Sequence, residues 1–291
     1  MRATAYAKLN LTLRVLGRRR DGFHDLEALT VSVSDPHDVV EVEAVPHPGG
    51  ITLDVAGETG DVPTGPENIA VRAGEALLVR AGRSGHGVRM TLRKKIPAGA
   101  GLGGGSADAA AALVAIQRLL EVEIDDSGLL EIGASVGSDV PFCLNGGAAW
   151  MRGRGEVLEP VAVPGGSPVV VALPPLRLVT RTVYEAWDEL GGPRSTREVP
   201  APAAAGGIVE SCVNDLEPAA EHVEPRLVEF RQALEDAAGV PALLAGSGSA
   251  YVVMIESADR VASVVRKIRR ALKVPVASSQ TVTRGVRLGT G

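Results

Sequence analysis

The chain has 291 residues and carries 30 Lys and Arg against 35 Asp and Glu, a formal charge of −5. This balance argues against a nucleic-acid binder that works by neutralising phosphates, and 45% hydrophobic with 22% charged residues excludes a disordered chain. Glycine is abundant, at 35 residues, whereas aromatic residues make up only 3% of the chain. The core must therefore consist mainly of Ala, Val, Leu and Ile.

The first half of the chain is predicted to contain strands and three helices. Apolar residues alternate with polar or small ones, the period of a half-buried strand, over residues 9–15, 39–43 and 88–92. Apolar residues at helical spacing predict helices over residues 67–81, 107–120 and 127–136. Gly82 and Gly137 end the first and third helices, and Ser106 is placed to cap the second.

The turn-rich stretch 161–167 is the predicted domain boundary, which divides the chain into residues 1–163 and 164–291. Strands and helices alternate beyond it, a pattern typical of a small two-layer α/β sandwich. The strands are expected at 169–173, 242–245 and 250–255, and the helices at 182–190, 225–238 and 259–272. The Pro/Ala/Gly-rich stretch 191–207 is expected to be an exposed loop.

Cellular setting is predicted from the cysteines and the apolar runs. Cys143 and Cys212 lie outside any CxxC or zinc-ligand pattern and are expected to be free thiols. No apolar run approaches the ~20 residues that a membrane span needs. We therefore expect a cytoplasmic enzyme with neither a membrane nor a nucleic acid as partner, and the sequence leaves its oligomeric state open.

The densest local signal is a run of five glycines within the seven residues from Gly99 to Gly105. It lies between a predicted strand and a predicted helix. Glycines leave backbone N–H groups unshielded, and at a helix N-terminus these groups and the helix dipole attract anions, most often phosphate. The sequence therefore predicts a phosphate-binding loop, and the alternative is a flexible turn without a ligand.

Two common phosphate-binding motifs, the dinucleotide fingerprint and the Walker A loop, are also rich in glycine. Gly99-x-Gly101-x-x-Gly104 formally matches the dinucleotide fingerprint, which leaves an NAD-type oxidoreductase open. The strand before it ends in charged residues and Pro97, and no βαβ unit precedes it, which argues against that reading. A Walker A loop is excluded because the dipeptide Gly-Lys occurs nowhere in the chain.

Residues 97–107 resemble the ATP-binding motif of the GHMP kinases, the family of galactokinase and of homoserine, mevalonate and phosphomevalonate kinases. Residues 7–11 (Ala-Lys-Leu-Asn-Leu) and 244–250 (Leu-Ala-Gly-Ser-Gly-Ser-Ala) are similar to the first and third motifs of that family, in the same order. The resemblance implies an α+β fold of two domains. The N-terminal domain would be like domain 2 of ribosomal protein S5 and the C-terminal domain ferredoxin-like, with the active site in the cleft between them.

For catalysis the resemblance implies ATP, with magnesium carried on its phosphates, Lys8 as charge stabiliser and Asp139 as base. Only 5 lysines stand against 25 arginines, which favours a selected role for Lys8. The residues alone leave two alternatives open, an edge-protecting strand lysine and an aspartate that forms a turn. No cluster of acidic residues suggests a metal site, so no metal ligand is predicted.

The resemblance also implies a set of ATP-contacting residues. Asn68 belongs to this set, although it could equally be the N-cap of the first helix. The full set is Asn68, Lys94, Pro97, Ala98, Gly99, Ala100, Gly101, Leu102, Gly103, Gly104, Gly105, Ser106 and Ala107.

Residues 20–24 and 137–142 resemble one branch of the family, whose acceptor alcohol carries a cytidine diphosphate group. The implied acceptor-binding residues are Asn10, Phe23, His24, Thr180 and Tyr184. Phe23 and Tyr184 could sandwich the cytosine, with His24 on its edge, because unpaired bases are bound by stacking and edge hydrogen bonds. The family more often has Tyr where this chain has Phe23. Both aromatics could instead be core residues, and a family member acting on mevalonate or homoserine would need neither.

Overall fold

The computed structural model describes residues 1–46, 49–57, 62–163, 165–192 and 212–289. Its helices are α1 (Ile69–Arg80), α2 (Gly104–Leu119), α3 (Asp126–Val136), α4 (Val140–Asn145), α5 (Thr180–Glu189), α6 (Glu217–Val223), α7 (Arg226–Ala238) and α8 (Ala258–Leu272). Its strands are β1 (Arg2–Arg18), β2 (His24–Val45), β3 (Gly50–Gly57), β4 (Gly87–Lys94), β5 (Ala148–Gly153), β6 (Val157–Pro160), β7 (Pro168–Ala172), β8 (Val213–Asn214), β9 (Leu243–Leu244), β10 (Tyr251–Met254), β11 (Val276–Val282) and β12 (Val286–Leu288).

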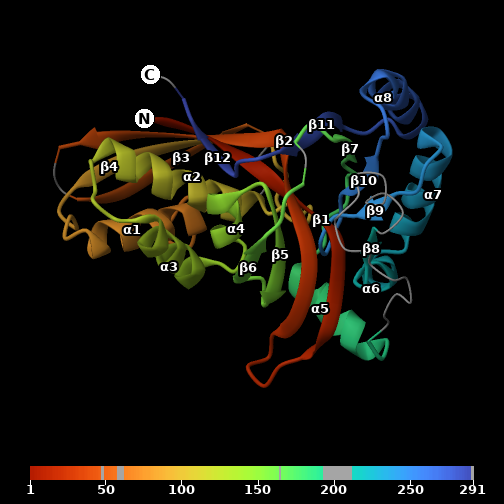
Figure 1. Ribbon diagram of the computed structural model, residues 1–291, viewed down its shortest axis with the longest axis horizontal. Helices are drawn as coiled ribbons and strands as arrows, with labels where there is room; N and C mark the ends of the chain where they lie inside the picture. Colours follow the sequence, from red (N-terminus) through yellow and green to blue (C-terminus); the bar gives the residue numbers. More distant parts are fainter. Residues whose placement is uncertain (47–48, 58–61, 164, 193–211, 290–291) are drawn as a thin grey trace.

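Two long antiparallel strands, β1 and β2, organise the first half of the chain. They pair along nearly their full length and end in a hairpin that projects from the body (Figure 1). Strands β4 and β5 pair with different stretches of β2, and β3 and β6 extend the sheet from them. The alternation of apolar and polar residues along these segments buries one face, as expected for such a sheet.

Helix α2 lies against the buried face of β1 and β2 and also contacts α1 and α4. Its stretch from Ala107 to Ala112 is entirely buried. Small alanine side chains let a helix approach a sheet closely, so a core poor in aromatic residues can still be dense. The start of α2 is thereby held next to the middle of β1.

The second half of the chain forms β7, β9, β10 and β11 with α7 and α8 beside them (Figure 1). Strand β11 pairs with β7 through residues 276–280 and with β2 through residues 281–282. Strands β8 and β12 both pair with β1. The two halves of the chain therefore share one hydrogen-bonded sheet, which places α5 and the turn after β9 close to the N-terminal strands.

Most expected helices and strands are confirmed within a few residues, and Cys143 and Cys212 are not joined in a disulfide bond. The cap predicted for Ser106 is wrong. Helix α2 begins at Gly104, with Gly103 at its N-cap in a left-handed conformation, so Ser106 lies inside the first turn. The short helices α4 and α6 were not expected. The loop predicted over 191–207 lies outside the described residues apart from 191–192.

Candidate active site

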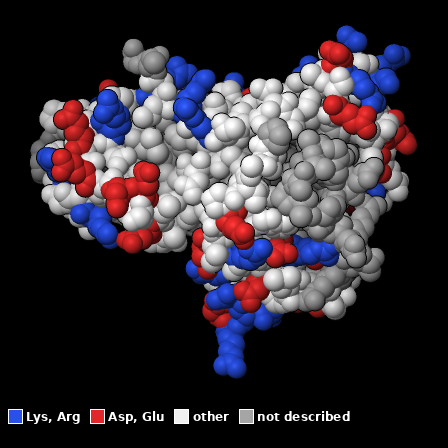
Figure 2. Space-filling view, viewed as in Figure 1, with Lys and Arg blue, Asp and Glu red and all other residues white. Residues whose placement is uncertain are grey.

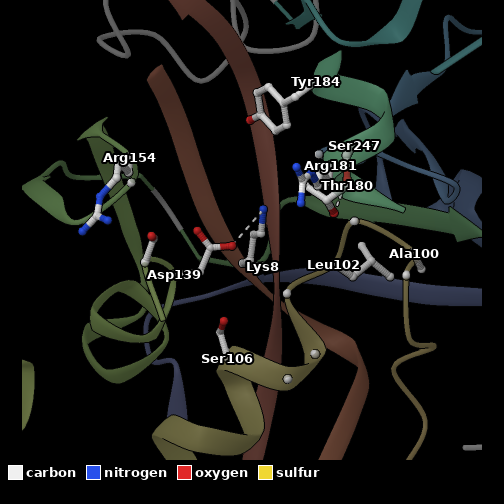
Figure 3. A pocket seen from close by; sticks show the side chains of 18 of the residues that line it. Lys8, Ala100, Leu102, Ser106, Asp139, Arg154, Thr180, Arg181, Tyr184 and Ser247 are labelled. Atoms are coloured by element: carbon white, nitrogen blue, oxygen red, sulfur yellow. Dashed lines mark hydrogen bonds and ion pairs between the residues drawn. The ribbon is translucent and has the colours of Figure 1, made fainter. Parts of the chain in front are cut away.

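A cavity of about 1030 Å³ opens where β1, β2, the glycine loop, the start of α2 and the start of α5 meet (Figure 3). Every predicted site residue lines it except Ala107, which is fully buried in α2. Further lining residues include Arg18, Arg154, Arg181 and Asp188, which the sequence did not single out. The residues predicted from separate motifs are thus brought into one place.

Backbone contacts clamp the glycine loop from two sides. The Lys8 N–H of β1 donates to the carbonyl of Leu102 at 3.0 Å. From the opposite side, the N–H groups of Ser249 and Ala250 donate to the carbonyls of Gly99 and Ala100, both at 3.2 Å. The third motif, residues 244–250, therefore supports the glycine loop directly.

Gly101 is the tightest point of this clamp. Its φ is +78°, and an added Cβ would lie 1.7 Å from the carbonyl oxygen of Ala245. Backbone atoms cannot yield as a flexible side chain can. A side chain at this position is therefore incompatible with the observed contact between the two loops.

We expect Gly101→Ala to lower the free energy of unfolding by about 2–4 kcal/mol, because it combines left-handed strain with overpacking. Chemical denaturation measures this loss, and titration calorimetry should show weaker ATP binding. Gly105→Ala is the matched stability control, since its Cβ would meet only Ile69 Cγ2, at an ordinary 3.7 Å. Wild-type stability in Gly101→Ala would contradict the clamp.

Lys8 and Asp139 both line the cavity and point toward one another (Figure 3). Lys8 is 7% exposed, and its Nζ lies 3.5 Å from Asp139 Oδ2 and donates to Asn10 Oδ1 at 2.7 Å. Asn10 donates in turn to Thr30 Oγ1 at 2.7 Å. Asp139 stands at the N-terminus of α4 but its side chain makes no capping bond there, so the carboxylate is directed to Lys8.

The aliphatic stem of Lys8 packs directly against Gly103 and leaves no room for a side chain there. A Cβ on Gly103 would lie 2.7 Å from Lys8 Cγ. The start of α2, the glycine loop and the Lys8–Asp139 pair are therefore packed against one another. Chemically, this arrangement offers anion-binding N–H groups, one ammonium group and one carboxylate within a single pocket.

Lys94 occupies a different environment from the one predicted for an ATP contact. It is 5% exposed, and its ammonium group binds Asp38 Oδ2 and, at 2.7 Å, Asp108 Oδ2. Asp38 also accepts from the backbone N–H groups of Lys95 and Ile96, just before the glycine loop. This buried cluster ties the entry of the loop to α2, and direct contact between Lys94 and ATP stays a prediction.

The cluster has two carboxylates for one ammonium group. Burial lowers the pKa of Lys94, but the two carboxylates outweigh it and the pKa is raised. Burial raises the pKa of Asp108 well above its ordinary value, and Asp38 adds to this while Lys94 opposes it. Asp108 Oδ1 is the buried side-chain oxygen without a hydrogen-bond partner among the described residues.

Asn68 is the N-cap of α1, which confirms the interpretation of this residue as a helix cap. Its Oδ1 accepts from the Ala70 N–H at 2.9 Å, and its Nδ2 donates to the Pro63 carbonyl at 2.7 Å. Both groups of the side chain are thus used inside the protein. A contact with ATP through this residue stays a prediction.

The acceptor-side residues come from β1, the β1–β2 hairpin and α5. Phe23 is 54% exposed, and the Arg154 guanidinium lies 5.0 Å from its ring centroid, so the interpretation as a core aromatic is wrong. His24 stacks on Tyr184 with ring centroids 4.8 Å apart. One face of Tyr184 is therefore already covered, and the predicted sandwich of a base between Phe23 and Tyr184 stays a prediction.

Thr180 opens α5 and its Oγ1 lies 2.9 Å from Ser247 Oγ in the third motif. Arg18, Arg154 and Arg181 also line the cavity, and Arg154 and Arg181 lie on opposite sides of the Lys8–Asp139 pair in Figure 3. Acidic residues accompany them. The outer face drawn in Figure 2 likewise intersperses both signs of charge.

Within the described ranges, no group of three or more His, Cys, Asp or Glu side chains could hold a metal ion. No helix in the part of the chain that the structure describes is long and apolar enough to cross a membrane.

Comparisons with known proteins show which family the chain resembles. The family model of the GHMP kinases N terminal domain matches residues 68–147, and that of the GHMP kinases C terminal matches residues 203–274. A 4-diphosphocytidyl-2-C-methyl-D-erythritol kinase of Pelotomaculum thermopropionicum is 40% identical over 273 residues, covering 91% of this chain and 93% of its own. The Thermus thermophilus enzyme of the same name is 39% identical over 272 residues, covering 92% and 93%.

Solved structures agree with the sequence relatives. A crystal structure of 4-(cytidine 5'-diphospho)-2C-methyl-D-erythritol kinase is 37% identical and covers 97% of this chain and 99% of its own, with a TM-score of 0.79. Homoserine kinase from Cytophaga hutchinsonii, at 19% identity and a TM-score of 0.74 over 99% and 96%, shares the fold. The two-domain α+β fold expected from the motifs is confirmed, and the dinucleotide interpretation of the glycine loop falls away. The chain belongs to the GHMP kinases and, within them, to the 4-diphosphocytidyl-2-C-methyl-D-erythritol kinase family.

Proposed function

We propose that this protein transfers the γ-phosphoryl group of ATP to the 2-hydroxyl of 4-diphosphocytidyl-2-C-methyl-D-erythritol, a step of the non-mevalonate isoprenoid pathway. The observation that carries the proposal is the Lys8–Asp139 pair, which lies beside a clamped glycine loop in one cavity. Relatives at 37–40% identity bear the name of this kinase. Phosphoryl transfer needs positioning, charge neutralisation and a proton acceptor, and the cavity holds residues for each.

In the proposed reaction Asp139 accepts the proton of the attacking hydroxyl, and Lys8 stabilises charge on the transferring group. Asn10 and Thr30 hold the Lys8 ammonium group in place through their hydrogen bonds. The N–H groups of the glycine loop and the N-terminus of α2 would bind the phosphates. Magnesium would arrive on the ATP phosphates and neutralise part of their charge.

For the acceptor, we propose that Phe23 and Tyr184 supply stacking surface and that His24 binds the edge of the base. Thr180 and the arginines of the cavity lie where a diphosphate could be bound. The small-molecule acceptor and ATP would be the only partners in the reaction. The division into residues 1–163 and 164–291 and a cytoplasmic location remain predictions.

The decisive experiment incubates the purified protein with ATP, magnesium and 4-diphosphocytidyl-2-C-methyl-D-erythritol. ADP release is followed, and the product mass should rise by one phosphoryl group. Mevalonate and homoserine serve as controls, because the same fold acts on other alcohols. Turnover of either control without turnover of the cytidyl alcohol would overturn the proposed substrate.

Phe23→Ala is expected to raise KM for the cytidyl alcohol by roughly 10- to 100-fold, because base–aromatic stacking contributes about 1–3 kcal/mol. KM for ATP should stay within about twofold, and steady-state kinetics measure both. Phe23→Tyr is the matched control, since it keeps the ring at an exposed position. An unchanged KM in Phe23→Ala would remove Phe23 from the site.

A further inference from the structure

Three side chains of helix α5 contact the ring of His24. It is 8% exposed, stacks on Tyr184, and meets Trp187 edge-on with centroids 5.7 Å apart. Its Nε2 lies 2.9 Å from Asp188 Oδ1, across 164 residues of chain. Tyr184, Trp187 and Asp188 all belong to α5, so one helix determines the orientation of this ring.

Asp188 also determines where the ring proton resides. A carboxylate can only accept a hydrogen bond, so Nε2 must carry the hydrogen that it donates. The other carboxylate oxygen lies 3.4 Å from Arg18 Nη1, which places a cation on the far side of Asp188. In the neutral imidazole, Nδ1 is then an acceptor.

The remaining ring nitrogen of His24, Nδ1, is available to a ligand. Among the described residues, Nδ1 of His24 has no hydrogen-bond partner. The atom is not fully buried either, because the only fully buried side-chain atom without a partner in the described part of the chain is Asp108 Oδ1. His24 and Asp188 both line the cavity. A ligand in the cavity therefore meets an acceptor nitrogen in a fixed direction.

We propose that Asp188 is a positioning residue that fixes the tautomer of His24, so that Nδ1 accepts from the exocyclic amine of cytosine and rejects uracil. This inference rests on the proposed function. At ring position 4, cytosine carries an amine donor and uracil carries a carbonyl acceptor. An acceptor nitrogen attracts the first and repels the second. Discrimination by a matched buried polar group is large, because the wrong ligand leaves that group unpaired.

The test compares the cytidine diphosphate alcohol with its uridine diphosphate counterpart as substrates. Wild-type protein should prefer the cytidine compound by at least ~100-fold in kcat/KM. Asp188→Asn should reduce this preference at least ~10-fold, since an amide can either accept from Nε2 or donate to it and no longer selects one tautomer. KM for ATP and kcat with saturating cytidine compound should change by less than about threefold.

Glu189→Ala is the matched control, because Glu189 is the next residue of α5, is exposed, and does not line the cavity. It should retain the wild-type preference. ¹⁵N NMR of the histidine ring, assigned with His24→Gln, should show the proton on Nε2 in the wild-type protein. In Asp188→Asn a second tautomer should appear.

The outcomes separate this inference from the proposed function. If wild-type protein turns over the cytidine compound but Asp188→Asn keeps the full preference, the role of Asp188 is refuted while the function stands. If wild-type protein turns over neither compound, the proposed function fails. The NMR spectrum still decides the tautomer in that case, and a proton on Nδ1 would refute the role of Asp188.

Discussion

Asp139→Asn is expected to lower kcat by about 10²–10⁴-fold while the protein stays folded and binds ATP, because the amide cannot take the proton of the attacking hydroxyl. Lys8→Ala should lower kcat by about 10²–10³-fold, the usual loss when one preorganised charge-stabilising group is removed. In Lys8→Ala, Asp139 also loses an ion-pair partner 3.5 Å away. Initial rates of ADP release give kcat, and titration calorimetry gives ATP affinity.

Two exposed residues serve as matched controls. Lys95→Ala removes an exposed lysine beside the glycine loop that does not line the cavity, and Asp126→Asn removes an exposed aspartate on α3. Both should turn over within about twofold of the wild type. Turnover within tenfold of wild type in either Asp139→Asn or Lys8→Ala would contradict the role given to that residue.

Local motifs were enough to predict the residues at the centre of the site. The glycine loop is unusual in composition by itself, whereas Lys8 and Asp139 were predicted because their segments resemble family motifs. The structure places all three in one cavity. The first residue of α2 was harder to predict, because the run of glycines continues from the loop into the helix. The change of conformation at Gly103 depends on the space that Lys8 occupies, which is a tertiary contact.

The residues that were missed act over long distances in the sequence. Asp188 is 164 residues from His24, and Asp38 is 56 residues from Lys94. Neither carboxylate stands in a motif, and each lies in a segment whose periodicity reports only a strand or a helix. Likewise, β11 divides its pairing between β7 and β2, which no local pattern encodes. Strand order and buried charge pairing become visible only when the sheet is assembled.

Lys94→Met should be among the most destabilising single changes in this protein. It leaves Asp38, which is fully buried, and Asp108, which is 3% exposed, without their shared cation. Breaking a buried ion pair from one side costs about 3–5 kcal/mol. Asp108→Asn is the matched control, because it leaves one carboxylate with one ammonium group and removes the carboxylate whose Oδ1 has no described partner. Its loss should be clearly smaller when measured by urea denaturation.

The pH dependence distinguishes charge from lost packing in this cluster. Because the folded pKa of Asp108 is raised above its ordinary 3.8, the folded protein holds a proton that the unfolded chain releases, and stability falls as pH rises above that value. Lys94→Met removes the cation that opposes this shift, so its deficit should be small near pH 4 and grow toward neutral pH. Asp108→Asn lacks the titrating group and should show a flatter profile than the wild type over the same range. A Lys94→Met deficit that is equal at all pH values would mean that the lysine stem, rather than its charge, holds the entry of the glycine loop.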